Sequence, residues 1–395
     1  MNPNELLLKL QEDHYRGYIT AEKLDKERKE VQEETKKRLL KKYQEDSTPE
    51  EIKQYEKDLD EGFKKLESVD RPTKYEDPSM YSLMLELSSI IQSGIETSNV
   101  IHQETRKVVK LTDLDYNFAK PYFGSINFGE INAATIPCDD NKHLILFHSE
   151  YTTFCFLICK IIIQLMPEYI LTSEKSFEDY IKEIKEKISK SPIIIQRFKE
   201  LIITYVTTGR ATKAPVYEIS HKFNQMVVEF THAMEVFAMG HEYAHVLLSH
   251  TSAGSLEKEF SLEGVSRIYY RQFQEYEADH LAFTLTLEGL KNQGFENYFS
   301  TYMGFETFFS GLDVCERAKC IVEIGDDTWY WRKGGRNSGE SRDHPPLDAR
   351  REKLRTQAEF VFGEKFLIGG KITAEIVKTL YEKIKPDLMK IYNNS

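Results

Sequence analysis

The feature that most constrains this chain is a row of residues, spaced three or four apart, between positions 223 and 248. The row consists of Phe223, Val227, Phe230, Met234, Phe237, His241, Ala244, His245 and Leu248. Because this spacing places side chains on one face of a helix, the sequence predicts a helix over about residues 223–250 with that face buried. The two histidines then lie one turn apart on the core side, where a polar ring needs a partner.

The segment Gly240–His250 reads GHEYAHVLLSH and contains the pattern HExxH. His241 and His245, one turn apart, can chelate a single metal ion, and Glu242 is placed to reach a water on that ion. Two interpretations without a metal remain open. HExxH is short enough to occur by chance, and two buried histidines can be hydrogen-bonded core residues. A third ligand is therefore needed.

A candidate third ligand lies in a second predicted helix, over about residues 265–290. Glu275 and Asp279 are four residues apart and share a face, and Ala278 and Ala282 beside them permit close approach to the first helix. Glu275 would complete a two-histidine, one-glutamate site with an open position for water. Asp279 would accept the outer N–H of a ligating histidine, whereas Glu277 points to the opposite side.

Three motifs together carry a resemblance to a known family. HEYAH at 241–245 and EYEAD at 275–279 resemble the HExxH and ExxAD pair of gluzincin metallopeptidases, in particular family M48. HPPLDAR at 344–350 resembles the HPPLxxR segment that follows the active-site helices in that family. The resemblance covers about residues 230–355 and implies a zincin-like peptidase domain. Soluble HExxH proteases that act in bacterial defence are a weaker resemblance.

The resemblance also implies roles for individual residues. The positions matching His241, His245 and Glu275 bind one catalytic Zn²⁺ in the family, and the position matching Glu242 is the general base. The position matching Asp279 supports a zinc ligand from outside. We therefore expect a zinc-dependent endopeptidase that hydrolyses a protein or peptide substrate.

Two further residues near the third motif have open roles. His344 is a candidate catalytic residue that would stabilise the oxyanion, or else a structural histidine in a proline-constrained turn. Arg350 would either stabilise the oxyanion or form an ion pair with Asp279 or Glu275.

The remainder of the chain suggests an α+β protein that is predominantly helical. Residues 1–68 are rich in Lys and Glu and predict an exposed helical arm, with a capping box from Thr48 to Glu51. Residues 69–395 form the predicted zinc metallopeptidase domain, with short strands between Tyr122 and Tyr151. The apolar run Thr152–Met166 is too short to cross a membrane and is interrupted by Lys160, which favours a buried helix.

Charge and cysteine content limit the partners and the compartment. The formal net charge of −11 disfavours nucleic acid as a partner. Five cysteines, an odd number, and no visible export signal predict reduced thiols and a cytoplasmic location.

Three functional hypotheses follow. The first is the zinc endopeptidase described above. A variant of it is a regulatory or defence protease kept latent, by the arm or by a loop, until a signal arrives. The alternative from another class is a non-catalytic, zinc-stabilised scaffold protein that recruits a regulatory partner through its helical arm. Glu242 separates these classes, because a closed structural zinc site has no use for an acid beside its ligands.

Overall fold

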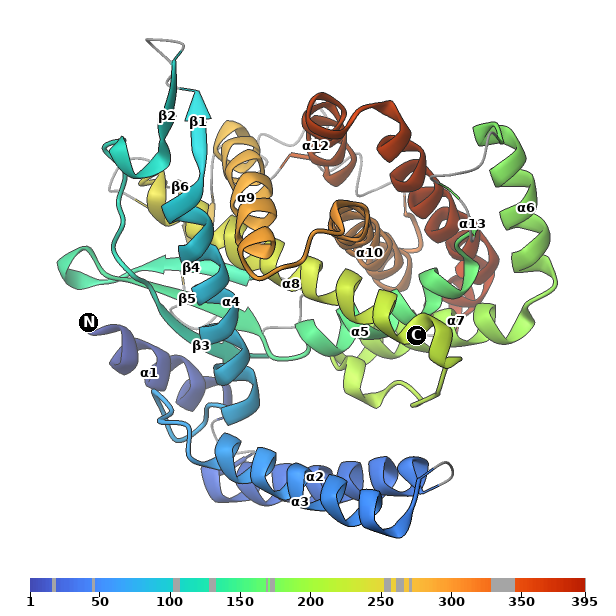
Figure 1. The fold of residues 1–395 in the computed structure, drawn as a ribbon, viewed down its shortest axis with the longest axis horizontal. Helices are drawn as coiled ribbons and strands as arrows, with labels where there is room; N and C mark the ends of the chain where they lie inside the picture. Colours follow the sequence, from blue (N-terminus) through green and yellow to red (C-terminus); the bar gives the residue numbers. More distant parts are fainter. Residues whose placement is uncertain are drawn as a thin grey trace.

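The computed structural model describes residues 1–15, 19–44, 47–101, 107–127, 133–167, 170, 175–251, 257–260, 266–269, 272–327 and 345–394. In these ranges helices predominate and the strands form small sheets, so the expected α+β, mainly helical class is confirmed (Figure 1). Within the same ranges, no helix combines the length and apolar character that a membrane crossing requires. All five cysteines are free thiols.

Two N-terminal helices form an exposed hairpin, α2 (Ala21–Tyr43) and α3 (Pro49–Glu67), which projects below the body in Figure 1. The predicted capping box begins α3, since the Thr48 side chain accepts from the Glu51 amide and Glu51 accepts from the Thr48 amide. No residue of α3 is buried. Lys36 joins the two helices through Asp60, at 2.6 Å, and Glu56.

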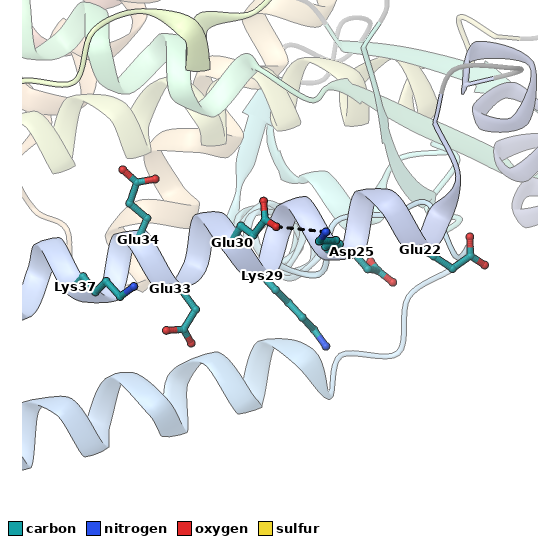
Figure 2. A pocket seen from close by; sticks show the side chains of 8 residues that line it. Glu22, Asp25, Lys29, Glu30, Glu33, Glu34 and Lys37 are labelled. Atoms are coloured by element: carbon teal, nitrogen blue, oxygen red, sulfur yellow. Dashed lines mark ion pairs between the residues drawn. The ribbon is translucent and has the colours of Figure 1, made fainter.

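A shallow cavity of about 830 Å³ runs along α2 (Figure 2). Every residue that lines it is charged and belongs to that helix: Glu22, Asp25, Lys26, Lys29, Glu30, Glu33, Glu34 and Lys37. Acidic and basic side chains alternate along this face and it has no apolar anchor, so it is a solvated helix surface.

Helix α1 (Pro3–Tyr15) differs from the expected exposed arm, and that prediction is wrong for this segment. Leu7 is fully buried and fills the space above Gly124, where an added Cβ would lie 2.4 Å from the leucine Cδ1. Gln11 donates to the Ser125 carbonyl at 2.9 Å and to Glu76 at 3.0 Å. These contacts join α1 to the body through residues more than 60 positions away, which local composition does not reveal.

A three-stranded sheet lies beside α1, in the region where strands were predicted. It contains β3 (Tyr122–Ile126), β4 (Ala133–Pro137) and β5 (His143–His148) in the order β3-β5-β4. Strand β3 is parallel to the central strand β5, and β4 is antiparallel to it. Because β5 lies in the middle, β4 is an edge strand. A separate ribbon pairs β1 (Asn99–Ile101) with β2 (Val108–Lys110).

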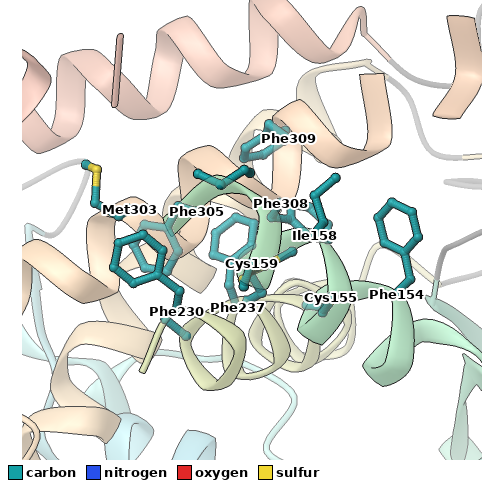
Figure 3. Packing of buried hydrophobic residues seen from close by; sticks show 14 of the residues in the cluster. Phe154, Cys155, Ile158, Cys159, Phe230, Phe237, Met303, Phe305, Phe308 and Phe309 are labelled. Carbon is teal, nitrogen blue, oxygen red and sulfur yellow. Dashed lines mark hydrogen bonds between the residues drawn. The ribbon is translucent and has the colours of Figure 1, made fainter. Parts of the chain in front are cut away.

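The main core is helical. Helix α8 (Asn224–Leu247) packs against α5 (Tyr151–Leu165) and α10 (Tyr298–Ile324), and the Phe237 ring makes tilted and edge-to-face contacts with Phe305, Phe308 and Phe309 (Figure 3). Around this core lie α4 (Pro78–Thr97), α6 (Phe177–Ser189), α7 (Pro192–Thr208), α12 (Leu347–Phe362) and α13 (Glu364–Asn394). As predicted, the apolar segment after Tyr151 is a buried helix.

Helix α8 is more deeply buried than the predicted stripe implies. Every residue from Ala233 to Leu247 is buried, not only one face. The reason is that α4, α5, α9 (Gln272–Asn292), α10 and strand β4 all pack against it.

Helix α9 begins later than expected. Residues Ser266–Tyr269, predicted as its first turn, form strand β7, which pairs antiparallel with β6 (Glu257–Phe260). Ile268 and Tyr269 are residue types that favour strands, and the hairpin pairing prevails over the helical spacing.

Helices α4 and α9 cross with their backbones in contact. A Cβ added to Gly94 would lie 2.4 Å from the Leu285 carbonyl oxygen, and one added to Gly289 would lie 2.5 Å from the Ile90 carbonyl oxygen. Real Cβ atoms do not approach backbone so closely, so only glycine fits at either position. This crossing fixes α9 relative to the body.

Candidate metal centre

Three predicted metal ligands meet between α8 and α9. The Nε2 atoms of His241 and His245 lie 3.1 Å apart. Glu275 Oε2 lies 3.5 Å from His241 Nε2, and Glu275 Oε1 lies 3.6 Å from His245 Nε2. His245 and Glu275 are fully buried and His241 is 9% exposed. Among the described residues, this is the one group of three or more candidate ligands close enough to hold a metal ion.

The spacing of these atoms matches a tetrahedral zinc site. Zinc binds imidazole nitrogen and carboxylate oxygen at roughly 2.0–2.2 Å, so two ligand atoms on a tetrahedron lie roughly 3.3–3.5 Å apart. The three separations of 3.1, 3.5 and 3.6 Å fall close to this range. The two distances to Glu275 end on different carboxylate oxygens, so the three residues fit a zinc ion after a small rotation that turns one oxygen toward both Nε2 atoms.

The outer nitrogen of His241 has the carboxylate partner that the sequence predicted. Asp279 Oδ1 lies 3.0 Å from His241 Nδ1, so Nδ1 carries the proton and donates it to the carboxylate. This tautomer, assigned from the hydrogen bonds, leaves a lone pair on Nε2 whenever the ring is neutral.

The outer nitrogen of His245 has a partner that sequence reasoning missed, the ring of His250. The chain turns back at Ser249, which has φ +54°, and brings His250 Nδ1 to 3.0 Å from His245 Nδ1. His250 Nε2 lies 3.4 Å from Glu277 Oε2. The sequence carries only a weak signal for this contact, because it depends on the chain reversal after α8.

The protonation states of His245 and His250, which are linked to each other and to Glu277, can also be assigned. Burial lowers the pKa of His250 to about 4 and that of His245 well below its usual range, so both rings are neutral. His250 donates through Nε2 to Glu277 and accepts at Nδ1 from His245. His245 Nε2 therefore carries a lone pair directed at the same point as Glu275.

The acid–base state of His241 shows what a metal would replace. Burial alone would lower its pKa, but hydrogen bonds to Asp279 and Glu275 raise the pKa to about 9. Without a metal, the second proton of His241 lies on Nε2, between the Nε2 atoms of the two histidines, and keeps their lone pairs from facing each other. A bound cation takes the place of that proton, so metal binding releases it.

Arg350 lies against both carboxylates. Its Nε and Nη2 donate to Asp279 at 2.7 and 2.6 Å, and its Nη1 lies 3.0 Å from Glu275 Oε2. Of the two roles considered for this arginine, the geometry matches the ion pair. The guanidinium, 7% exposed, holds Asp279 and Glu275 in position behind the histidines.

Glu242 is held by a residue that the sequence did not point to. Thr135 Oγ1, on edge strand β4, lies 2.8 Å from Glu242 Oε2 and 3.0 Å from the Glu242 carbonyl oxygen. Glu242 is 4% exposed. The strand thus fixes both the backbone and the side chain of the residue between the two histidines.

His344, the other predicted catalytic residue, lies outside the described residues.

In comparisons with protein-family models, curated proteins and solved structures, the chain shows no match. The function of this protein is therefore inferred from the geometry of its metal centre.

Proposed function

We propose that this chain is a zinc-dependent endopeptidase of zincin-like fold, with His241, His245 and Glu275 as metal ligands and Glu242 as general base. The observation that carries the proposal is the convergence of two imidazole lone pairs and one carboxylate at tetrahedral spacing. Both outer nitrogens have fixed partners, so each ring presents Nε2 to the same point.

The ligand set leaves room for chemistry. In the described part of the chain the metal-ligand group contains three residues, whereas structural zinc sites have four protein ligands. When bound, zinc supplies Lewis-acid polarisation of a carbonyl and a water of lowered pKa. A Glu beside the first histidine then has a function that a purely structural site lacks.

Each residue around the metal-ligand group has its own role in the proposed reaction. Glu242 accepts the proton of the attacking water and returns it to the leaving amine. Thr135 orients the Glu242 carboxylate through Oε2. Asp279 and His250 hold the two imidazole rings in their ligating tautomers. Arg350 offsets part of the charge of the two buried carboxylates and reduces their mutual repulsion.

Burial of the site supports the latent variant of this proposal. Glu242 is 4% exposed, so a polypeptide substrate reaches it only after the site opens. The α2–α3 hairpin is not the cover, because Figure 1 shows it well away from α9 and α12. The other cover considered, the Gly-containing loop at 331–346, lies largely outside the described residues.

The decisive experiment compares Glu242→Gln with wild type for zinc content and, after mild destabilisation to open the site, for cleavage of casein. We expect the variant to keep one zinc per chain and to lose at least about 100-fold in kcat, since general acid–base catalysis contributes roughly 100- to 10,000-fold. Glu235→Gln is a matched control, because Glu235 is also a buried glutamate on α8. It should retain both zinc and activity.

Two results would contradict the proposal. Full casein cleavage by Glu242→Gln would remove Glu242 from catalysis. Stoichiometric zinc with no cleavage of any protein by the wild type, after mild destabilisation to open the site, would favour the scaffold hypothesis.

A further inference from the structure

A cavity of about 440 Å³ lies among α10, α12 and α13, separate from the metal centre. Its volume is within the range of sites that hold small organic molecules. Five cationic side chains line it: Arg317, Arg351, Arg355, Lys371 and Lys378. Three acidic residues, Asp313, Asp348 and Glu375, share the lining.

Some of these cations already have carboxylate partners. Arg355 is bidentate to Glu306, at 2.7 and 3.0 Å. Arg317 pairs with Asp327 at 3.1 Å and stacks on the ring of Tyr381. Their charge is therefore largely used within the protein.

Lys378 lies 3.9 Å from Glu375, whereas the two remaining cations have no carboxylate partner in the described residues. Arg351 donates through Nη1 to Ser310 Oγ at 3.2 Å, and neither it nor Lys371 has an ion pair within the described ranges. The Nε atom of Arg351 is buried with no hydrogen-bond partner among the described residues. An arginine with donors to spare, together with a nearby lysine, provides several N–H groups for one multivalent anion.

The cavity also offers one acceptor. Asp313 Oδ1 is buried and has no hydrogen-bond partner in the described part of the chain. Buried polar atoms without partners are rare in folded proteins, and donors and an acceptor occur here in one cavity. An occupant that matches both has an anionic group and a hydroxyl or amino donor. Phe177 and Val377 supply an apolar wall for its remaining part.

We infer that this cavity binds a phosphorylated small molecule of nucleotide size, with its phosphate on Arg351 and Lys371 and a hydroxyl or amino group on Asp313. Three phosphate oxygens match the available donors of the two cations. The apolar wall favours an organic phosphate over inorganic phosphate.

The site also bears on the metal centre, and this part rests on the proposed function. Arg351 directly follows Arg350, which holds Asp279 and Glu275. A phosphate on Arg351 fixes this turn of α12 and with it the support of the zinc ligands. Occupancy of the cavity and zinc binding are therefore coupled, and linkage makes the coupling reciprocal.

The binding test is calorimetric titration of the full chain with ADP, and with adenosine and citrate for comparison. ADP should bind, whereas adenosine, which lacks phosphate, and citrate, which has only carboxylates, should bind at least about 10-fold more weakly. Arg351→Met and Lys371→Met should each weaken ADP binding about 10-fold or more. Lys371 is exposed, so its variant keeps the fold. Lys353→Met, an exposed position on the same helix, is the matched control and should bind ADP normally.

The outcomes separate the two claims. Absence of ADP binding at millimolar concentration, equal binding of citrate, or unchanged affinity in both variants overturns the phosphate site. Saturating ADP should tighten zinc binding at least about 3-fold in a chelator competition, and an unchanged zinc affinity overturns the coupling alone. A chain that binds ADP but no zinc refutes the proposed function and leaves the phosphate site standing.

Discussion

Helix α12 carries two buried arginines, five residues apart, that make nearly the same contact with different results. Arg350 is bidentate to Asp279, and Arg355 is bidentate to Glu306. Behind Arg350 stand two histidines whose nitrogens converge with Glu275. Beside Arg355 the additional polar partner of Glu306 is the Tyr302 hydroxyl, at 2.7 Å.

The difference shows what distinguishes a candidate site from a structural ion pair. Burial of charge is common to both clusters, since Glu275 is fully buried and Glu306 is 1% exposed. Only the first cluster brings lone pairs from three ligands to one point. Convergence of acceptors, not the buried ion pair, is therefore the feature that predicts metal binding.

The clusters around Arg350 and Arg355 are distinguished most clearly by removing one of the converging imidazole nitrogens. We expect His245→Ala to lose stoichiometric zinc, a fall of more than about 1,000-fold in affinity, because two ligands on opposite helices do not hold the ion. Metal analysis of the purified protein measures this. Glu306→Gln serves as the control and should retain one zinc per chain. Equal zinc content in both variants would show that the two clusters do not differ in this way.

The next effect is on stability and belongs to the structural cluster. Glu306→Ala leaves the Arg355 guanidinium buried beside Tyr302 without its main partner, which should cost about 3–5 kcal/mol of unfolding free energy. Urea unfolding of the metal-free protein measures it. A loss below about 1 kcal/mol would mean that the arginine is readily rehydrated, and that this pair is not structural.

The smallest effect concerns a third buried carboxyl, Glu76, which has hydrogen bonds from Ser125 and Gln11 but no ion pair in the described residues. Burial raises its pKa to about 7. Folding therefore takes up a proton between about pH 4.5 and 7, so the stability contribution is complete below pH 4.5 and disappears as the pH rises through 7. The loss amounts to about 3 kcal/mol at most.

Urea unfolding at pH 5 and pH 8 tests this third case. The wild type should lose stability relative to Glu76→Gln over this range, because the variant has no proton to release. Parallel pH profiles would indicate that Glu76 is ionised in the folded protein and behaves like the carboxylates that arginine neutralises.

Local sequence periodicity predicted much of the candidate site and less of its surroundings. The spacing of His241, His245, Glu275 and Asp279 is a property of two helices, and the structure brings these four residues together. The ion pair of Arg350 was one of two alternatives, and the geometry selects it.

The partners that sequence reasoning missed depend on contacts between distant segments. Thr135 reaches Glu242 only because β4 is the edge strand that packs on α8. His250 reaches His245 through a single residue with positive φ. Helix α1 was assigned to the arm because residues 1–68 as a whole are rich in Lys and Glu, whereas its buried residues face a sheet far along the chain. No local pattern encodes such pairings.

The crossing of α4 and α9 has a consequence for interpreting mutational scans. Gly289 lies 14 residues after Glu275 on the same helix, a distance of about 21 Å, yet it determines how far α9 stands from the body. A methyl group there would shift the helix by more than the few tenths of an ångström that metal coordination tolerates. In an unbiased screen for loss of zinc, substitutions at Gly94 and Gly289 should therefore score with the ligands themselves, although neither glycine contacts the ion.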